Sequence, residues 1–230
     1  MVPINTSHTN PLDTQLTNAL AASASSARVK AALEVGTHPD PTLVDALVAR
    51  CAVEPDFFVR DMLTWALTRL PPDITVPRLR AQLRAENAQA RSQALHTLSK
   101  IGDASAWPAI TRSLLRDSDD EVARSAWRAA VVLVPDGRER DLAEELATQL
   151  GRGDREVQLS LSRALVALGE VVEPMLRTAM RDDDPSVHAH ASATERLLRD
   201  PDAGFELAVD EAKRFVALGG GRGPEQRADR

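Results

Sequence analysis

The chain of 230 residues contains no tyrosine, one cysteine, four phenylalanines and three tryptophans. A single cysteine excludes an intramolecular disulfide framework and a cysteine-rich zinc module. Aromatic residues make up 3% of the chain while 43% of it is hydrophobic, so we expect a core of aliphatic side chains and alanine. The strands of a β-sandwich or β-barrel favour aromatic and β-branched residues, and this composition therefore disfavours both folds.

The chain also lacks an excess of positive charge and a long apolar run. Its 28 basic and 34 acidic residues give a formal net charge of −6, which disfavours sequence-independent binding to nucleic-acid phosphates. The longest wholly apolar run covers residues 129–134, far short of the roughly 20 residues that span a bilayer. Residues 1–11 have neither the basic nor the apolar segment of a secretory signal. We therefore predict a cytoplasmic protein without a membrane segment.

An internal repeat organises the chain. Five periodic helical patterns open on a small apolar residue, here called the anchor, at spacings of 30 to 35 residues. The anchors are Val59, Ala90, Val122, Val157 and Val187. An Asp or Asn stands three positions before each anchor, at Asp56, Asn87, Asp119, Asp154 and Asp184. Such side chains accept hydrogen bonds from the free N–H groups of a helix start, so each anchor should lie in the first turn of a capped helix.

A second apolar pattern with helical spacing precedes each anchor, which gives helix–turn–helix units of about 32 residues. An earlier, less regular unit covers residues 11–36, and a last helix over 202–218 would cap the stack. The predicted fold is all-α: a right-handed α-solenoid of about six antiparallel hairpins, forming one domain over residues 11–218. By composition, residues 1–10 and 219–230 are predicted to be flexible.

Three more positions recur relative to the anchors: a proline thirteen residues before, an aspartate five residues before, and an arginine directly after. The matching residues are Pro77, Pro174, Asp117, Asp182, Arg60 and Arg91, with Pro108 and Glu54 as near matches. Over residues 11–200 this pattern resembles the HEAT-repeat family. The resemblance implies a binding scaffold whose second helices line a concave face, with arginines paired to aspartates of neighbouring turns. Departures stand at Ala85 and Arg152 for the aspartate, and at Ala123, Gln158 and His188 for the arginine.

The sequence suggests no catalytic, cofactor-binding or metal-binding residues. The iron-binding hydroxylases of this family use His-Glu pairs, and no His-Glu dipeptide occurs in this chain. His188 and His190 are two residues apart on a predicted helix and point in different directions, so we interpret them as two partly exposed histidines. Cys51 lies on an apolar stripe, and we expect a buried, inert thiol. We therefore predict a protein that is not an enzyme and has no cofactor.

The concave face is the predicted site. On a helical wheel, the positions two, five, six and nine after each anchor lie opposite the buried stripe. Tryptophan and arginine most often carry interface energy, which favours this stripe as a binding surface. The predicted partner-binding residues are Trp65, Leu95, His96, Arg124, Trp127, Arg128, Leu159 and Arg163. A structural interpretation stays open, in which Trp65 and Trp127 pack sideways onto the neighbouring hairpin.

We predict a scaffold or adaptor for a protein or peptide with apolar anchors and some acidic residues. One alternative is a DNA-binding or DNA-repair protein resembling the HEAT-like alkylpurine glycosylases, with Trp65, Trp127 and Asp61 as the matching residues. The net charge of −6 and the few arginines oppose this alternative. Another is an enzyme resembling the bilin lyases that share these repeats, although no distinctive pocket motif supports it.

Overall fold

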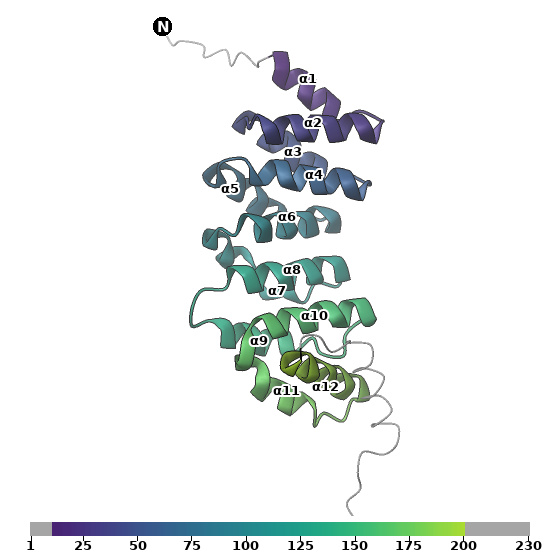
Figure 1. The fold of residues 1–230 in the computed structure, drawn as a ribbon, viewed down its shortest axis with the longest axis vertical. Coiled ribbons are helices and arrows are strands. Elements are labelled where there is room, and N and C mark those ends of the chain that lie inside the picture. Colours follow the sequence, from purple (N-terminus) through teal and green to yellow (C-terminus); the bar gives the residue numbers. More distant parts are fainter. Residues whose placement is uncertain (1–10, 201–230) are drawn as a thin grey trace, which may run out of the picture. The chain divides into compact units, whose positions relative to one another are not determined.

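The computed structural model describes residues 11–200, and the regular elements in that range are α-helices and short 3-10 helices (Figure 1). The predicted capping helix and both predicted flexible ends lie outside the described residues. The chain divides after Leu133 into two compact units. Unit 1 here means residues 11–133, and unit 2 means residues 134–200. The prediction of a single domain over 11–218 stays a prediction.

Unit 1 is a stack of four helical hairpins in two layers. Its helices are α1 (Pro11–Leu20), α2 (Ser25–Thr37), α3 (Val44–Cys51), α4 (Phe57–Thr68), α5 (Pro72–Gln82), α6 (Ala88–Ile101), α7 (Arg112–Leu115) and α8 (Asp120–Leu133). The second helix of each hairpin packs against the next second helix, in the order α2, α4, α6, α8 (Figure 1). In the other layer α3 contacts α5, and α5 contacts the 3-10 helix Ala104–Ala109. The predicted all-α solenoid is confirmed.

Unit 2 adds two hairpins of the same kind, which brings the described hairpins to the predicted six. They are built from α9 (Glu139–Ala147), α10 (Arg155–Ala167), the 3-10 helix Gly169–Val172, α11 (Glu173–Ala179) and α12 (Pro185–Arg199). The second helices α10 and α12 pack against each other, as do the first helices α9 and α11.

All five predicted helix caps form. In each case a side-chain Oδ1 accepts a hydrogen bond from a backbone N–H in the first turn; for Asp56 the donors are the N–H groups of Phe58 and Val59, at 2.9 and 3.2 Å. The other four caps are Asn87, Asp119, Asp154 and Asp184. The core is aliphatic as predicted, and Cys51 is buried within it. Burial raises the pKa of this thiol to about 12, so it is protonated and inert, as predicted.

Arginine–carboxylate pairs connect consecutive hairpins in unit 1. Arg28 on α2 donates from Nε and Nη2 to the two carboxylate oxygens of Glu54, at 2.7 and 2.8 Å. Arg91 on α6 pairs with Asp117 in the same way, at 3.0 and 3.1 Å, which confirms the predicted pairing for that arginine. Both Nη1 atoms also donate to two carbonyl oxygens, five and six residues earlier in the chain. Each arginine thus holds the turn before its own helix through the two carbonyl oxygens, and it contacts the turn of the next hairpin through the carboxylate.

Glu54 is the most heavily bonded carboxylate of unit 1. It is fully buried, and besides Arg28 it accepts from Arg50 Nε at 2.7 Å and from the N–H of Asp56 at 2.9 Å. Burial raises the pKa of Glu54, but these hydrogen bonds outweigh burial and lower the pKa to about 2. Glu54 is therefore ionised throughout the physiological range.

The series of arginine–carboxylate pairs is interrupted at Arg60. Its Nη1 donates to the carbonyl oxygens of Glu54 and Pro55, both at 2.9 Å, like its counterparts on α2 and α6. Ala85 stands where those counterparts meet a carboxylate, and Arg60 makes no ion pair within residues 11–200. Instead its guanidinium lies 5.7 Å from the ring centroid of Phe57. The predicted aspartate pairing is therefore wrong for Arg60, because Ala85 stands at the position from which Glu54 and Asp117 reach the other two arginines.

Unit 2 has a neutral network where unit 1 has ion pairs. His190 Nδ1 accepts from the N–H of Gly151 at 3.0 Å, so the ring proton sits on Nε2. His190 Nε2 lies 3.0 Å from the carbonyl oxygen of Gln158 and 3.0 Å from Ser162 Oγ. Ser162 Oγ in turn lies 2.7 Å from Thr194 Oγ1, which donates to the carbonyl oxygen of His190 at 2.8 Å. This network joins α10 to α12.

The prediction that His190 is partly exposed is wrong. Its side chain has no solvent exposure, because it faces the neighbouring helix α10, whereas His188 is half-buried. Burial lowers the pKa of His190 to about 4, and its hydrogen bond to Gln158 offsets only part of that effect. His190 is therefore neutral at pH 7.

Candidate partner-binding surface

The second-helix layer separates the predicted site positions into two groups. Six residues after each of the first four anchors the side chain reaches solvent: Trp65, Arg128 and Arg163 are exposed, and His96 is half-buried. Five residues after each of these four anchors the side chain is buried: Thr64, Leu95, Trp127 and Ser162. For these four helices the helical wheel therefore identified the exposed position correctly at six and wrongly at five.

Side-by-side packing of second helices explains this difference. A residue five after one anchor faces the residue seven after the next anchor. Thr64 Oγ1 lies 3.5 Å from Thr97 Oγ1, and Ser162 Oγ lies 2.7 Å from Thr194 Oγ1. Position five thus belongs to the contact between helices, which no wheel of a single helix contains.

Leu95 and Trp127 consequently do not lie on the exposed surface, and the prediction that they project from it is wrong. Both have no solvent exposure. Trp127 instead fills the core of the last hairpin of unit 1, where its Nε1 donates to the carbonyl oxygen of Leu115 at 2.8 Å. The burial that the structural interpretation predicts for Trp127 is confirmed, although the hydrogen bond of its indole is made within its own hairpin and not to the neighbouring one. A buried indole with its N–H paired stabilises the core.

Trp65 is both packed against the neighbouring hairpin and exposed to solvent, so each of the two interpretations holds for part of its side chain. Its side chain is 37% exposed, yet one edge of the ring covers Gly36 on α2. A Cβ atom at position 36 would overlap the Trp65 ring, so only glycine allows this close approach. The ring is held in place from one side and open to solvent on the other, which is how a preorganised aromatic anchor is presented.

His96 and Arg128 continue the surface on α6 and α8. Burial, then the nearby charges of Arg128 and Lys100, lower the pKa of His96, while Asp61 acts in the opposite direction. Arg128 Nη2 lies 3.2 Å from Ser125 Oγ, which orients the guanidinium.

Arg124 lies one turn before Arg128 on the same helix and is half-buried. It pairs with Glu121 at 2.6 Å. Its Nε is buried and makes no hydrogen bond within the described part of the chain. The predicted residue is thus partly neutralised by its own helix.

Leu33 extends the same row onto α2. Arg28 makes the turn contacts of Arg60 and Arg91, so the anchor of this first hairpin is Ala27, and Leu33 stands six residues after it. Leu33 is 40% exposed. Leu33 is not among the partner-binding residues predicted from the sequence, although the arginine directly after Ala27 was a signal that could have revealed it. We name the row Leu33, Trp65, His96 and Arg128 the outer ridge of unit 1.

Exposed apolar side chains are concentrated in unit 1. The large hydrophobic residues with substantial exposure are Leu33, Val53, Phe57, Phe58, Trp65, Ile74 and Val132. Unit 2 exposes no large hydrophobic residue among residues 134–200. Its two predicted site residues differ: Leu159 is half-buried and packs against Ala193, whereas Arg163 is exposed.

Across residues 11–200, no three His, Cys, Asp or Glu side chains come close enough together to hold a metal ion. No helix in that range is long and apolar enough to cross a membrane.

Comparison with known proteins supports the repeat. A family model described as HEAT repeats matches residues 55–131. The resemblance predicted from the sequence is therefore confirmed for residues 55–131, which are similar to HEAT repeats. No curated protein matches the chain. Among solved structures, the chain is similar to one from the complex of CpcE and CpcF of phycocyanin lyase from Nostoc sp. PCC7120. That similarity has 19% identity and a TM-score of 0.48, and covers 92% of this chain and 91% of the other.

Proposed function

We propose that this chain is a non-enzymatic scaffold that binds a protein or peptide partner along the outer ridge of unit 1. The observation that carries the proposal is the partly exposed Trp65, seated on Gly36 and in line with exposed Leu33 and Arg128. Leu33 and Trp65 lie on adjacent helices and offer apolar surface at one end of the ridge. Arg128 supplies positive charge at the other end.

This arrangement favours a partner with a particular chemistry. An apolar side chain of the partner would cover Leu33 and the open side of Trp65, since burial of such surface contributes about 25 cal/mol per Å². An acidic side chain two helices further along would pair with Arg128, whose guanidinium is already oriented by Ser125. We propose an extended peptide or a partner helix with these two features.

Duplex DNA fits the outer ridge less well. Binding to a duplex relies on several phosphate contacts by basic side chains. On the ridge itself Arg128 is the one arginine or lysine, and the acidic Asp61 lies close enough to His96 to act on its pKa. A protein partner therefore remains the proposal.

The test is affinity capture from lysate with wild type beside a Trp65→Ser/Arg128→Ser variant. The matched control is Ile74→Ser/Arg78→Ser, because Ile74 is also 37% exposed and the pair lies in the other helix layer. We expect a partner that wild type and the control retain and that the ridge variant loses. A partner held equally by all three chains would show that the outer ridge is not the site.

A further inference from the structure

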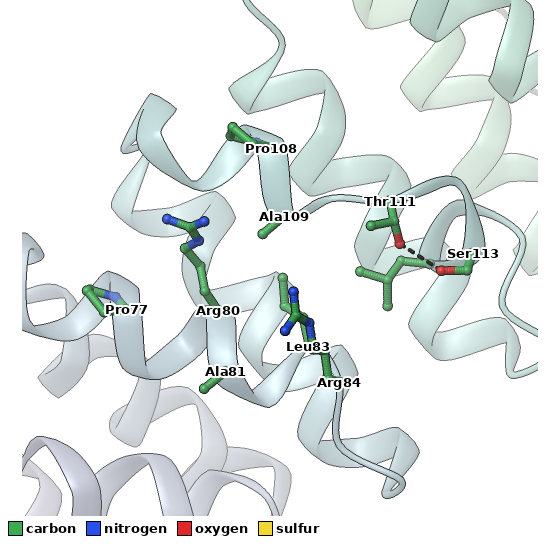
Figure 2. A pocket seen from close by; sticks show the side chains of 10 residues that line it. Pro77, Arg80, Ala81, Leu83, Arg84, Pro108, Ala109, Thr111 and Ser113 are labelled. Atoms are coloured by element: carbon green, nitrogen blue, oxygen red, sulfur yellow. Dashed lines mark hydrogen bonds between the residues drawn. The ribbon is translucent and has the colours of Figure 1, made fainter.

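A second surface of unit 1 lies in the first-helix layer. A pocket of about 570 Å³ opens between α5 and the segment 108–114 (Figure 2). Its volume is within the range of about 300–1,000 Å³ that is usual for binding sites. Arg80 and Arg84 extend from the end of α5 toward the segment on the other side (Figure 2).

The pocket carries positive charge without compensation. Arg80 and Arg84 line it, and no acidic residue does. Within residues 11–200 neither arginine makes an ion pair or a side-chain hydrogen bond. Arg80 lies in the last turn of α5, and Arg84 follows just beyond the end of that helix. An anion in the pocket would supply the opposite charge that both arginines lack.

The same charge bias extends around the pocket. Residues 72–84 hold Arg78, Arg80 and Arg84 against a single acid, Asp73, and residues 108–116 hold two arginines and no acid. Arg78 is already paired with Asp45 at 2.7 Å. This local excess of positive charge occurs in a chain whose net charge is −6. Arg80 and Arg84 therefore have no acidic partner within residues 11–200 and are available to an anionic ligand.

The remaining walls suit a peptide. Thr111 Oγ1 and Ser113 Oγ lie 2.7 Å apart and offer hydroxyl groups opposite the arginines (Figure 2). Ala81 and Leu83 add apolar surface against which the stem of an acidic side chain can pack. Pro77 restricts backbone motion on the α5 side of the pocket.

We propose that this pocket binds an acidic peptide segment of a partner protein, whose carboxylates pair with Arg80 and Arg84. A guanidinium binds a carboxylate through two parallel hydrogen bonds, and two arginines can hold two successive acidic side chains. The pocket lies in the layer opposite the outer ridge, so it is a separate site that does not depend on the function proposed above.

The experiment measures fluorescence anisotropy of a fluorescein-labelled hexaglutamate peptide with the full chain. Wild type is compared with Arg80→Gln/Arg84→Gln and with Arg69→Gln/Arg78→Gln, a control with the same change in net charge outside the pocket. Circular dichroism verifies that all three chains fold. We expect the pocket variant to bind about tenfold more weakly, as the loss of charge-assisted hydrogen bonds implies, and the control to stay within about twofold.

Further arms separate the sources of negative charge. Labelled duplex DNA and competing inorganic phosphate at equal ionic strength are measured alongside, and Trp65→Ser should leave hexaglutamate binding unchanged. Three results would each overturn the proposal: no binding of hexaglutamate to wild type, equal binding by the pocket variant, or tighter arginine-dependent binding of DNA or phosphate than of the peptide.

Discussion

The two units stack hairpins in the same way but hold them together with different chemistry. In unit 1 a buried carboxylate, Glu54, bridges Arg28 and Arg50 between hairpins. In unit 2 a network of neutral hydrogen-bonding groups centred on His190 and Ser162 connects the two hairpins. A buried ion pair contributes little net stability, but removal of one partner leaves a buried uncompensated charge and is strongly destabilising. In a buried neutral network, addition of a proton is the costly change. The two units should therefore respond differently to substitution and to acid.

The distribution of tryptophan makes this difference measurable. All three tryptophans, Trp65, Trp107 and Trp127, belong to unit 1. Tryptophan fluorescence therefore reports the unfolding of unit 1, while far-UV circular dichroism reports the helices of both units.

The largest effect is expected for Glu54→Ala in unit 1. The substitution leaves Arg28 buried without its carboxylate, and removal of one partner of a buried ion pair typically costs about 3–5 kcal/mol. Urea unfolding followed by tryptophan fluorescence measures the loss. Glu86→Ala removes an exposed carboxylate of the same unit and should change the free energy of unfolding by less than about 0.5 kcal/mol. A cost below about 1 kcal/mol for Glu54→Ala would show that the ion pairs of Glu54 with Arg28 and Arg50 do not hold these hairpins together.

Mild acid should weaken unit 2 more than unit 1, because the shift in pKa of His190 is larger than that of His96 in unit 1. The pKa of His190 falls from 6.5 in the unfolded chain to about 4 in the folded chain. Between these pH values the unfolded chain is protonated at His190 while the folded chain is not, so a fall in pH favours unfolding. The contribution of neutral His190 is complete above pH 6.5 and decreases as the pH falls toward 4, by about 2 kcal/mol at pH 5. The pKa of Glu54 falls from 4.5 to about 2, so its contribution is lost only between those lower values.

Thermal unfolding at pH 7 and pH 5 tests this order. We expect the circular dichroism transition to shift at pH 5 more than the tryptophan fluorescence transition. In a His190→Gln variant the difference between the two pH values should be smaller. A His96→Gln background serves as the control, since His96 in unit 1 also has a lowered pKa. An unchanged pH response in His190→Gln would assign the effect to another group.

A smaller effect distinguishes the two hydroxyl pairs at equivalent positions. Thr194→Val removes a hydroxyl that lies 2.7 Å from Ser162 Oγ in the buried network, and we expect a cost of about 1–2 kcal/mol. Thr97→Val removes a hydroxyl 3.5 Å from Thr64 Oγ1, at the limit of a hydrogen bond, and should cost less than about 1 kcal/mol. Urea unfolding followed by circular dichroism compares them. Equal costs would mean that the unit 2 network adds nothing to an ordinary hydroxyl contact.

The smallest effect is a gain. Ala85→Asp supplies the acid that is missing opposite Arg60, and the new pair should resemble that of Arg91 with Asp117. Because such pairs are partly exposed, we expect a stabilisation of about 0.5–1 kcal/mol in the tryptophan fluorescence transition. Ala85→Asn, which adds a polar side chain without charge, controls for the change in size. If Asn stabilises unit 1 as much as Asp does, Arg60 does not need a carboxylate there.

Much of the fold was readable from sequence, because its signals are local. Each Asx residue three positions before an anchor accepts hydrogen bonds from its own helix start, so caps such as Asp56 and Asp184 were predictable one by one. The arginine and aspartate of a pair such as Arg91 and Asp117 stand at fixed distances from their anchors. The first hairpin was less clear, since Ala27 is a weak anchor.

The candidate site was only partly predictable. Positions five and six after an anchor differ by about 100° on a helical wheel, and both lie away from the stripe that faces the first helix. The wheel thus gave Trp65 and Trp127 the same environment. In the structure one is 37% exposed and the other has no exposure. His190 was misassigned for the same reason, since its burial comes from the neighbouring helix α10.

The amino-acid sequence by itself therefore determined the helical hairpins, their period, their caps and the residue types available for pairing. Each of these depends on contacts within one turn or one hairpin. Only the tertiary structure decided which side of each second helix stays open, because that depends on how adjacent second helices pack. It also brought Arg80 and Arg84 to the same pocket as Thr111 and Ser113, since separate segments of chain meet there.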